Sequence, residues 1–115
     1  VKEYAKRWHA ENAPREREKN RRNHFKQKIA CMEHYGDGKC QCCGETRIEF
    51  LAIDHVDGGG SRHRAAVGGK MYRWLVKNGF PDEPKFRVLC HNCNMAIAFY
   101  GTCPHQVEKL ARRLK

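Results

Sequence analysis

The sequence predicts an α+β fold in the form of a small, zinc-stapled domain with basic helices on either side. Three observations predict it. Four of the seven cysteines form two C-x-x-C pairs, Cys40–Cys43 and Cys90–Cys93. Two short runs, 47–53 and 86–90, are rich in the β-branched and aromatic residues that favour strands. Lys and Arg number 23 against 13 acidic residues, and half of the net charge of +10 lies in the single segment 15–28.

The bulk composition limits the class of protein. A chain of 115 residues with 40% apolar residues is one domain in size and is marginal if it relies on a hydrophobic core alone. Its positive charge favours a polyanionic partner, either nucleic acid or an anionic membrane surface. The longest apolar run, 95–100, is far shorter than a membrane span, and the charged N-terminus does not resemble a signal peptide. We expect a soluble, cytoplasmic protein of a bacterial or phage-infected cell.

The N-terminal region predicts helix. Residues 1–13 carry Val1, Tyr4 and Trp8 at helical spacing, and Pro14 is expected to end or restart that helix. The segment 15–28 follows, with seven Lys or Arg against two acids. An amphipathic pattern then continues from it and is expected to stop in a glycine-containing turn at 35–38.

The two matched cysteine pairs predict a structural zinc ion, one per chain. A tight C-x-x-C turn points both sulfurs at one ion, so Cys40, Cys43, Cys90 and Cys93 supply four thiolates for tetrahedral zinc. Disulfides or unrelated buried thiols are the alternative, which a reducing compartment disfavours. Four thiolates leave no position open for substrate, so the metal would stabilise the fold. The three other cysteines are interpreted as small buried apolar residues rather than a second metal site: Cys31, Cys42 and Cys103.

Between the cysteine pairs the pattern predicts strand, loop, helix and strand. The strands are 47–53 and 86–90. Five glycines in 58–69 predict a flexible loop. Residues 70–79 predict a helix with Met71 and Leu75 on one side and a glycine as its stop.

Two helices are expected after the second cysteine pair. Residues 94–101 form the first, which ends at Gly101. The second is a basic amphipathic helix over 106–115. The expected organisation is therefore a basic helical extension (1–39), a core (40–103) and a basic C-terminal helix (104–115).

The order of these parts resembles the HNH endonucleases, which are ββα-metal nucleases. The resemblance rests on C-Q-C-C at 40–43, L-A-I-D-H-V at 51–56 and V-L-C-H-N-C-N at 88–94, and covers roughly 40–101. It implies an HNH fold for the core, with His55 as the general base. It also implies that Asp54 and Asn94 bind one divalent cation, usually magnesium, with manganese or another divalent ion as the alternative. Family members leave 5′-phosphate and 3′-hydroxyl ends.

The residue chemistry supports these roles independently. Carboxylate and amide oxygens are the hard ligands that magnesium prefers, and histidine titrates near neutrality and can take a proton from water. The alternative for Asp54 and His55 is a turn-forming Asp and a packed His at a strand end. The chain departs from the family at its middle asparagine, because Lys85 stands near that place, and Asn92 and Asn78 are the two alternatives that could substitute for it. Asp57 is interpreted as an Asp before a glycine turn.

Basic residues predict the nucleic-acid contacts. Basic side chains in the glycine-rich loop could bind phosphates near the bond that is cleaved. The helix after the loop and the segment 15–28 add further positive charge. The alternative is a solvated basic surface. The predicted contacts are Arg62, His63, Arg64, Lys70, Arg73, Arg17, Arg21 and Arg22.

Two functions follow as hypotheses. The first is a metal-dependent DNA endonuclease or nickase, encoded by a phage or mobile element, with DNA as its partner. The second is a non-catalytic, zinc-stabilised nucleic-acid-binding module. Asp54, His55 and Asn94 together favour the first, since a binding module needs no such set. A membrane-surface role is disfavoured. A homodimer remains an alternative to a monomer, since it is one route to double-strand cleavage.

Overall fold

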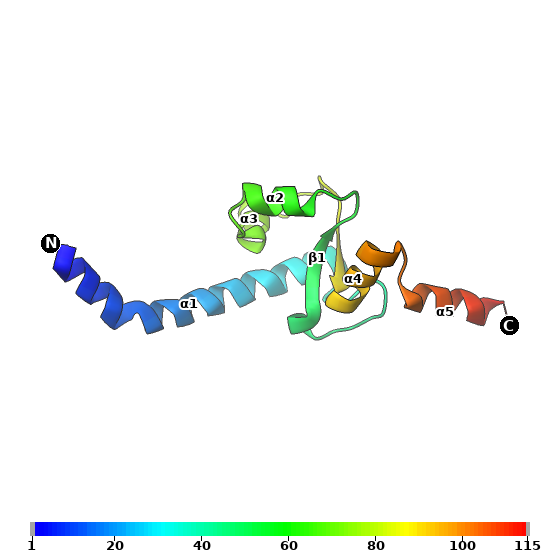
Figure 1. The fold of residues 1–115 in the computed structure, drawn as a ribbon, viewed down its shortest axis with the longest axis horizontal. Helices are drawn as coiled ribbons and strands as arrows, with labels where there is room; N and C mark the ends of the chain where they lie inside the picture. The colour runs from blue at the N-terminus through cyan, green and yellow to red at the C-terminus, as the bar shows by residue number, and fades with distance from the viewer. Residues whose placement is uncertain (1, 115) are drawn as a thin grey trace.

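The computed structural model describes residues 2–114 and shows helices around a small two-stranded sheet (Figure 1). This is the α+β class that the sequence predicts. Val1 and Lys115, at the ends of the two predicted terminal helices, lie outside the described residues. Along the chain the elements are α1 (Lys2–Gly36), η1 (Ile48–Phe50), β1 (Leu51–His55), α2 (Gly60–Ala66), α3 (Met71–Lys77), β2 (Phe86–Cys90), α4 (His91–Tyr100) and α5 (Pro104–Arg113).

The long helix α1 differs from the prediction at Pro14. We expect Pro14 to end or restart the helix, and this is wrong, because α1 runs through it. Proline inside a helix removes a hydrogen bond and bends the axis, and Figure 1 shows α1 bending within its dark-blue N-terminal part. The end of α1 is as predicted: Asp37 and Gly38 have φ values of 54° and 72°. The Gly38 N–H donates to the Met32 carbonyl at 3.0 Å, which satisfies the open helix end.

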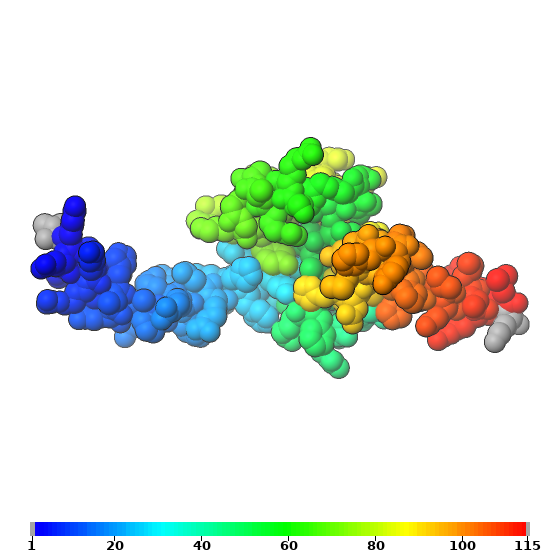
Figure 2. Space-filling model, viewed as in Figure 1, coloured from blue at the N-terminus to red at the C-terminus, as the bar shows by residue number. Residues whose placement is uncertain are grey.

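The molecule is elongated because both terminal helices leave the central body. It measures 72 × 26 × 25 Å along its principal axes. Figure 2 shows the first part of α1 and all of α5 projecting from opposite sides of that body. Among the described residues, no helix is long and apolar enough to cross a membrane.

The sheet consists of β1 and β2, which pair antiparallel. The predicted strand at 86–90 is confirmed. The predicted strand at 47–53 is confirmed only in its second half, since its first half forms the 3₁₀ turn η1 and the strand continues to His55. The register sets His55 opposite Phe86 at one end of the ladder.

The segment between the strands is more ordered than its glycines suggest. We expect a flexible loop over 58–69, but the structure forms the short helix α2 within it. Glycines bracket this helix, with Gly59 at φ 83° before it and Gly68 at φ 66° after it. The intervening Arg and Ala residues favour helix, so the glycines act as its boundaries. The next helix, α3, is confirmed and buries Met71 and Leu75 as predicted.

The core lies where α1, α3 and the sheet meet. Met32, Leu51, Leu75 and Val88 are fully buried there, beside several of the cysteines. The last turns of α1 thus belong to the core although its first part is exposed. Gly36 permits this approach, because a Cβ on it would lie 2.6 Å from the Val88 Cβ.

Candidate active site and metal centre

The two C-x-x-C pairs meet at one point of the fold. Cys40 and Cys43 lie in the loop before η1, Cys90 ends β2, and Cys93 lies in the first turn of α4. Their four Sγ atoms all lie within 4.8 Å of one another, and those of Cys43 and Cys90 are 3.7 Å apart. The predicted ligand set therefore comes together and could hold a zinc ion.

Backbone groups around these thiols favour thiolates in part. Burial opposes ionisation of Cys40, but hydrogen bonds from the backbone of Cys43, Cys90 and Cys42 and from the Cys43 side chain outweigh it and lower its pKa to about 7. The Cys93 N–H donates to the Cys90 Sγ at 3.5 Å, and the Cys43 N–H does the same for Cys40. Burial and the neighbouring thiols raise the pKa of Cys93. Zinc binding would displace the proton that this thiol otherwise keeps.

A separate cleft collects the residues predicted for chemistry. It has a volume of about 260 Å³ and is lined by Asp54 and His55 from the end of β1 and by Asn94 from α4. Asp54 and Asn94 are 40 positions apart in the sequence, and α4 brings them together because it begins directly after β2. Ser61 and Arg64 of α2 complete the wall opposite.

Asp54 forms an ion pair that the sequence alone does not predict. The Arg87 Nε donates to the Asp54 Oδ2 at 2.7 Å, and both side chains are partly exposed. The two residues face each other in the strand register, so only the pairing of β1 with β2 reveals the contact. Because the bond engages Oδ2, it fixes the carboxylate and leaves Oδ1 for a cation.

His55 is buried and held by a second histidine. Its side chain is 7% exposed, and its Nε2 lies 2.8 Å from the Nδ1 of His63. We expect His63 to contact phosphate, but the structure places its half-buried ring against His55 and edge-on to Trp74 at 4.5 Å. Helix formation over 60–66 explains this placement, because α2 turns that face toward the end of β1. Burial lowers the pKa of His55, and the nearby His63 and Arg64 lower it further.

A glycine lets α2 approach this ring. A Cβ on Gly60 would lie 3.0 Å from the Nδ1 of His55. Glycine at this position is therefore favoured by close packing at the cleft, whereas Gly58 and Gly59 have the positive φ values that favour glycine in a loop.

The other polar residues considered for the site lie away from the cleft. Asp57 is exposed and does not line it. Asn78 donates to the Trp74 carbonyl at the end of α3, and Asn92 is exposed on α4. Neither asparagine lines the cleft, and Lys85 does not line it either.

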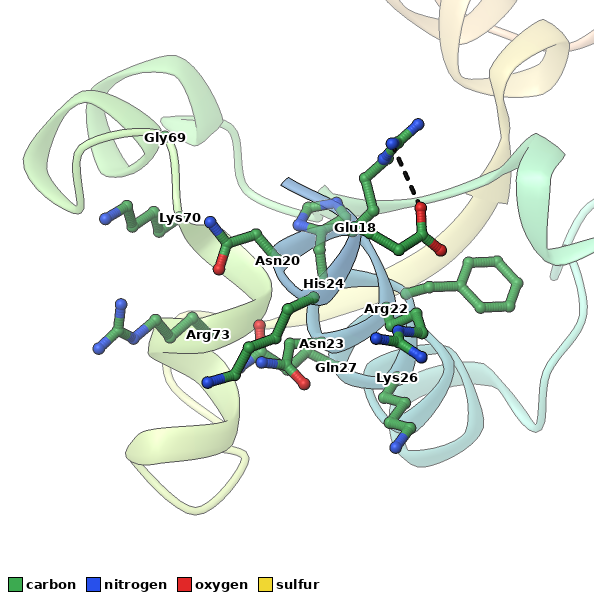
Figure 3. A pocket seen from close by; sticks show the side chains of 13 residues that line it. Glu18, Asn20, Arg22, Asn23, His24, Lys26, Gln27, Gly69, Lys70 and Arg73 are labelled. Atoms are coloured by element: carbon green, nitrogen blue, oxygen red, sulfur yellow. Dashed lines mark ion pairs between the residues drawn. The ribbon is translucent and has the colours of Figure 1, made fainter. Parts of the chain in front are cut away.

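A larger, basic groove runs between α1 and α3. It has a volume of about 1320 Å³, and Figure 3 shows Lys70 and Arg73 on one side of it and α1 on the other. Four predicted nucleic-acid contacts line it, namely Arg21, Arg22, Lys70 and Arg73. Arg17 and Arg62 are exposed outside this lining, and Arg64 belongs to the smaller cleft.

Comparison of the chain with protein-family models, with curated proteins and with solved structures gives no match. The chemistry that the cleft offers follows from its own groups. It combines oxygen ligands for a hard cation, a buried imidazole and an arginine within one small volume. Such a set can bind a phosphate ester and take a proton from a nucleophile.

Proposed function

We propose that this chain is a metal-dependent DNA endonuclease or nickase of the HNH type. One observation carries the proposal: Asp54, His55 and Asn94, which come from two elements of the fold, line the same cleft. The function needs these three groups within reach of one phosphodiester.

The donor set of the cleft fits a divalent cation. Asp54 offers a carboxylate oxygen and Asn94 an amide oxygen, and magnesium prefers such hard ligands while it keeps several of its waters. A volume of about 260 Å³ leaves room for those waters and a phosphate oxygen. Bound there, magnesium would neutralise charge on the phosphate and on the departing 3′ oxygen. Arg87 keeps the Asp54 carboxylate oriented for this role.

His55 acts as the general base. Its Nε2 is engaged by His63, so the tautomer that suits a base has the Nε2 proton donated to the Nδ1 of His63. The Nδ1 of His55 is then the free acceptor for a proton of the attacking water. The lowered pKa of His55 keeps the ring neutral at pH 7, which a base requires.

Cationic groups near the cleft bind the DNA backbone. Arg64 and Ser61 line the cleft itself and can hold the phosphate that is attacked. The groove lined by Arg21, Arg22 and Arg73 can hold a flanking stretch of backbone. Cys40, Cys43, Cys90 and Cys93 would hold a zinc ion that ties the end of β2 and the start of α4 to the loop before η1, which would keep Asn94 in place near Asp54.

Plasmid cleavage tests the proposal. Purified protein incubated with supercoiled DNA and magnesium should yield open-circular or linear product with 5′-phosphate ends, and EDTA should abolish it. A protein that binds DNA but cleaves none with magnesium, manganese, nickel or calcium would contradict the proposal. That result would favour the non-catalytic binding module.

A further inference from the structure

Two cysteines outside the C-x-x-C pairs lie beside the four-thiolate cluster. Cys42 and Cys103 are 5% and 2% exposed, and both approach Cys93. His105 joins them: its Nδ1 lies 3.2 Å from the Cys103 Sγ and 3.4 Å from the Cys93 Sγ. The ligand atoms of Cys42, Cys93, Cys103 and His105 all lie within 4.8 Å of one another.

The local sequence explains how these groups meet. Cys42 sits between the two ligands of the first C-x-x-C pair, so the same tight loop presents a third sulfur. Gly101, with φ 78°, ends α4 and turns the chain back toward the cluster. Cys103 is then the cap of α5, and Pro104 and His105 begin that helix.

We propose that Cys42, Cys93, Cys103 and His105 form a second tetrahedral zinc site, with the Cys93 sulfur bridging the two zinc ions. The chain then binds two zinc ions in one cluster of six cysteines and a histidine. This inference stands whether or not the cleft cleaves DNA, because it uses none of the cleft residues.

The spacings fit tetrahedral zinc. Zinc–sulfur and zinc–nitrogen bonds of usual length place two ligand sulfurs about 3.8 Å apart and a sulfur and a nitrogen about 3.6 Å apart. The contacts of His105 with Cys93 and Cys103, at 3.4 and 3.2 Å, are close to this spacing. A set of three cysteines and one histidine is also a common structural zinc site.

The net charge of the cluster does not oppose the binding of a second zinc ion. Six thiolates and two zinc ions carry a net charge of −2, the same as four thiolates and one ion, so the second site adds no net charge. Gln106 donates its amide N–H to the Cys42 Sγ at 3.1 Å, as expected beside a thiolate ligand. Lys109 donates to the Cys42 carbonyl at 2.9 Å and brings a positive charge to the same edge.

The second site has a structural purpose. No described residue of α5 is buried, so apolar packing does not hold this helix. Its fixed contacts lie at its start, through Cys103 and His105, and through Gln106 and Lys109 to Cys42. Zinc at this position joins the basic α5 to the end of β2 and the start of α4.

Metal analysis tests the inference. Wild-type protein dialysed against excess zinc and then freed of unbound metal should contain two zinc ions per chain by elemental analysis and native mass spectrometry. A folded wild-type protein with only one zinc ion overturns the proposal, and this outcome needs no variant. Substitution with cadmium-113 should give two NMR signals, one from a four-thiolate site and one from a site with a nitrogen ligand.

Variants assign the second ion to its ligands. His105→Ala and Cys103→Ser should each lower the content from two ions to one while circular dichroism shows that the fold is kept. Cys31→Ser is the matched control, because Cys31 is buried but belongs to neither group, and it should keep two ions. Retention of both ions by His105→Ala and Cys103→Ser would refute the ligand set.

Discussion

The Nε2 of His55 and the Nδ1 of His63 lie 2.8 Å apart, with their rings nearly perpendicular. The contact joins the last residue of β1 to the middle of α2 and leaves one nitrogen of His55 free. The contact restricts the orientation of the His55 ring. If His55 is the proposed base, we expect His63 to act as its positioning residue.

Loss of the His63 ring should slow cleavage without weakening DNA binding. Partners that orient a functional histidine typically contribute about 10–100-fold, so His63→Ala should lower kcat by roughly that factor. His63→Gln, whose side-chain oxygen can accept the same hydrogen bond, should recover part of the rate. The measurement is single-turnover plasmid nicking beside a DNA-binding titration. An unchanged rate combined with weaker binding would restore the phosphate role.

Asp54 and Asp57 should differ sharply. Asp54 lines the cleft, whereas Asp57 is exposed three residues away. Asp54→Asn removes the charged ligand of the proposed cation and should lower the cleavage rate by at least roughly a hundredfold at any magnesium concentration. Asp57→Asn should stay within about threefold of the wild type, since exposed substitutions are usually near neutral. Equal losses in the two variants would contradict the assigned ligand.

The groove between α1 and α3 should bind DNA in a salt-dependent manner. Each lost phosphate contact lowers the slope of log affinity against log salt by about 0.9 on double-stranded DNA. Arg73→Ala, in the groove, should show this change in fluorescence-anisotropy titrations. Arg17→Ala is the comparison, because the sequence also predicts a contact for this exposed arginine but the structure leaves it outside the groove lining, and we expect its slope to stay near the wild-type value. A lower slope for Arg17→Ala with an unchanged slope for Arg73→Ala would show that the N-terminal part of α1, and not the groove, binds the DNA backbone.

Gly36 should tolerate no side chain. A Cβ there meets Val88, which is fully buried, at 2.6 Å. Overpacking of this kind costs about 1–3 kcal/mol, so Gly36→Ala should lower the free energy of unfolding by that amount. Glu33→Ala, at an exposed position of the same helix, should change it by less than about 0.5 kcal/mol. Chemical denaturation of the zinc-loaded protein gives both values.

Local patterns predict much of the fold, because they depend on neighbours in the chain. The spacing of apolar residues identifies α3, and the short run of Phe86, Val88 and Leu89 before Cys90 identifies β2. The matched cysteine pairs predict a ligand set that the structure assembles. Local rules fail at Pro14, which α1 accommodates within its exposed part, and at α2, which forms between glycines.

The finer features of the site depend on long-range pairing. Arg87 meets Asp54 only through the strand register, and His63 reaches His55 only once α2 has folded. From the sequence, Cys42 and Cys103 are interpreted as buried apolar residues because neither belongs to a matched C-x-x-C pair, although His105 lies only two positions after Cys103. In the structure the turn after α4 brings Cys103 and His105 to Cys93, and the loop of the first cysteine pair brings Cys42 there.

The proposed activation of water by His55 can be tested by substitution of this one residue. The measurement is the rate of supercoiled-plasmid nicking at saturating protein and magnesium for the wild type, His55→Ala and His34→Ala. His34 is a control, because it is exposed and stacks on Phe80 away from the cleft. We expect His55→Ala to bind DNA normally and to lose roughly 100-fold to 10,000-fold in rate, as for other general bases, while His34→Ala cleaves like the wild type. Equal cleavage rates for His55→Ala and the wild type would show that His55 is not the general base.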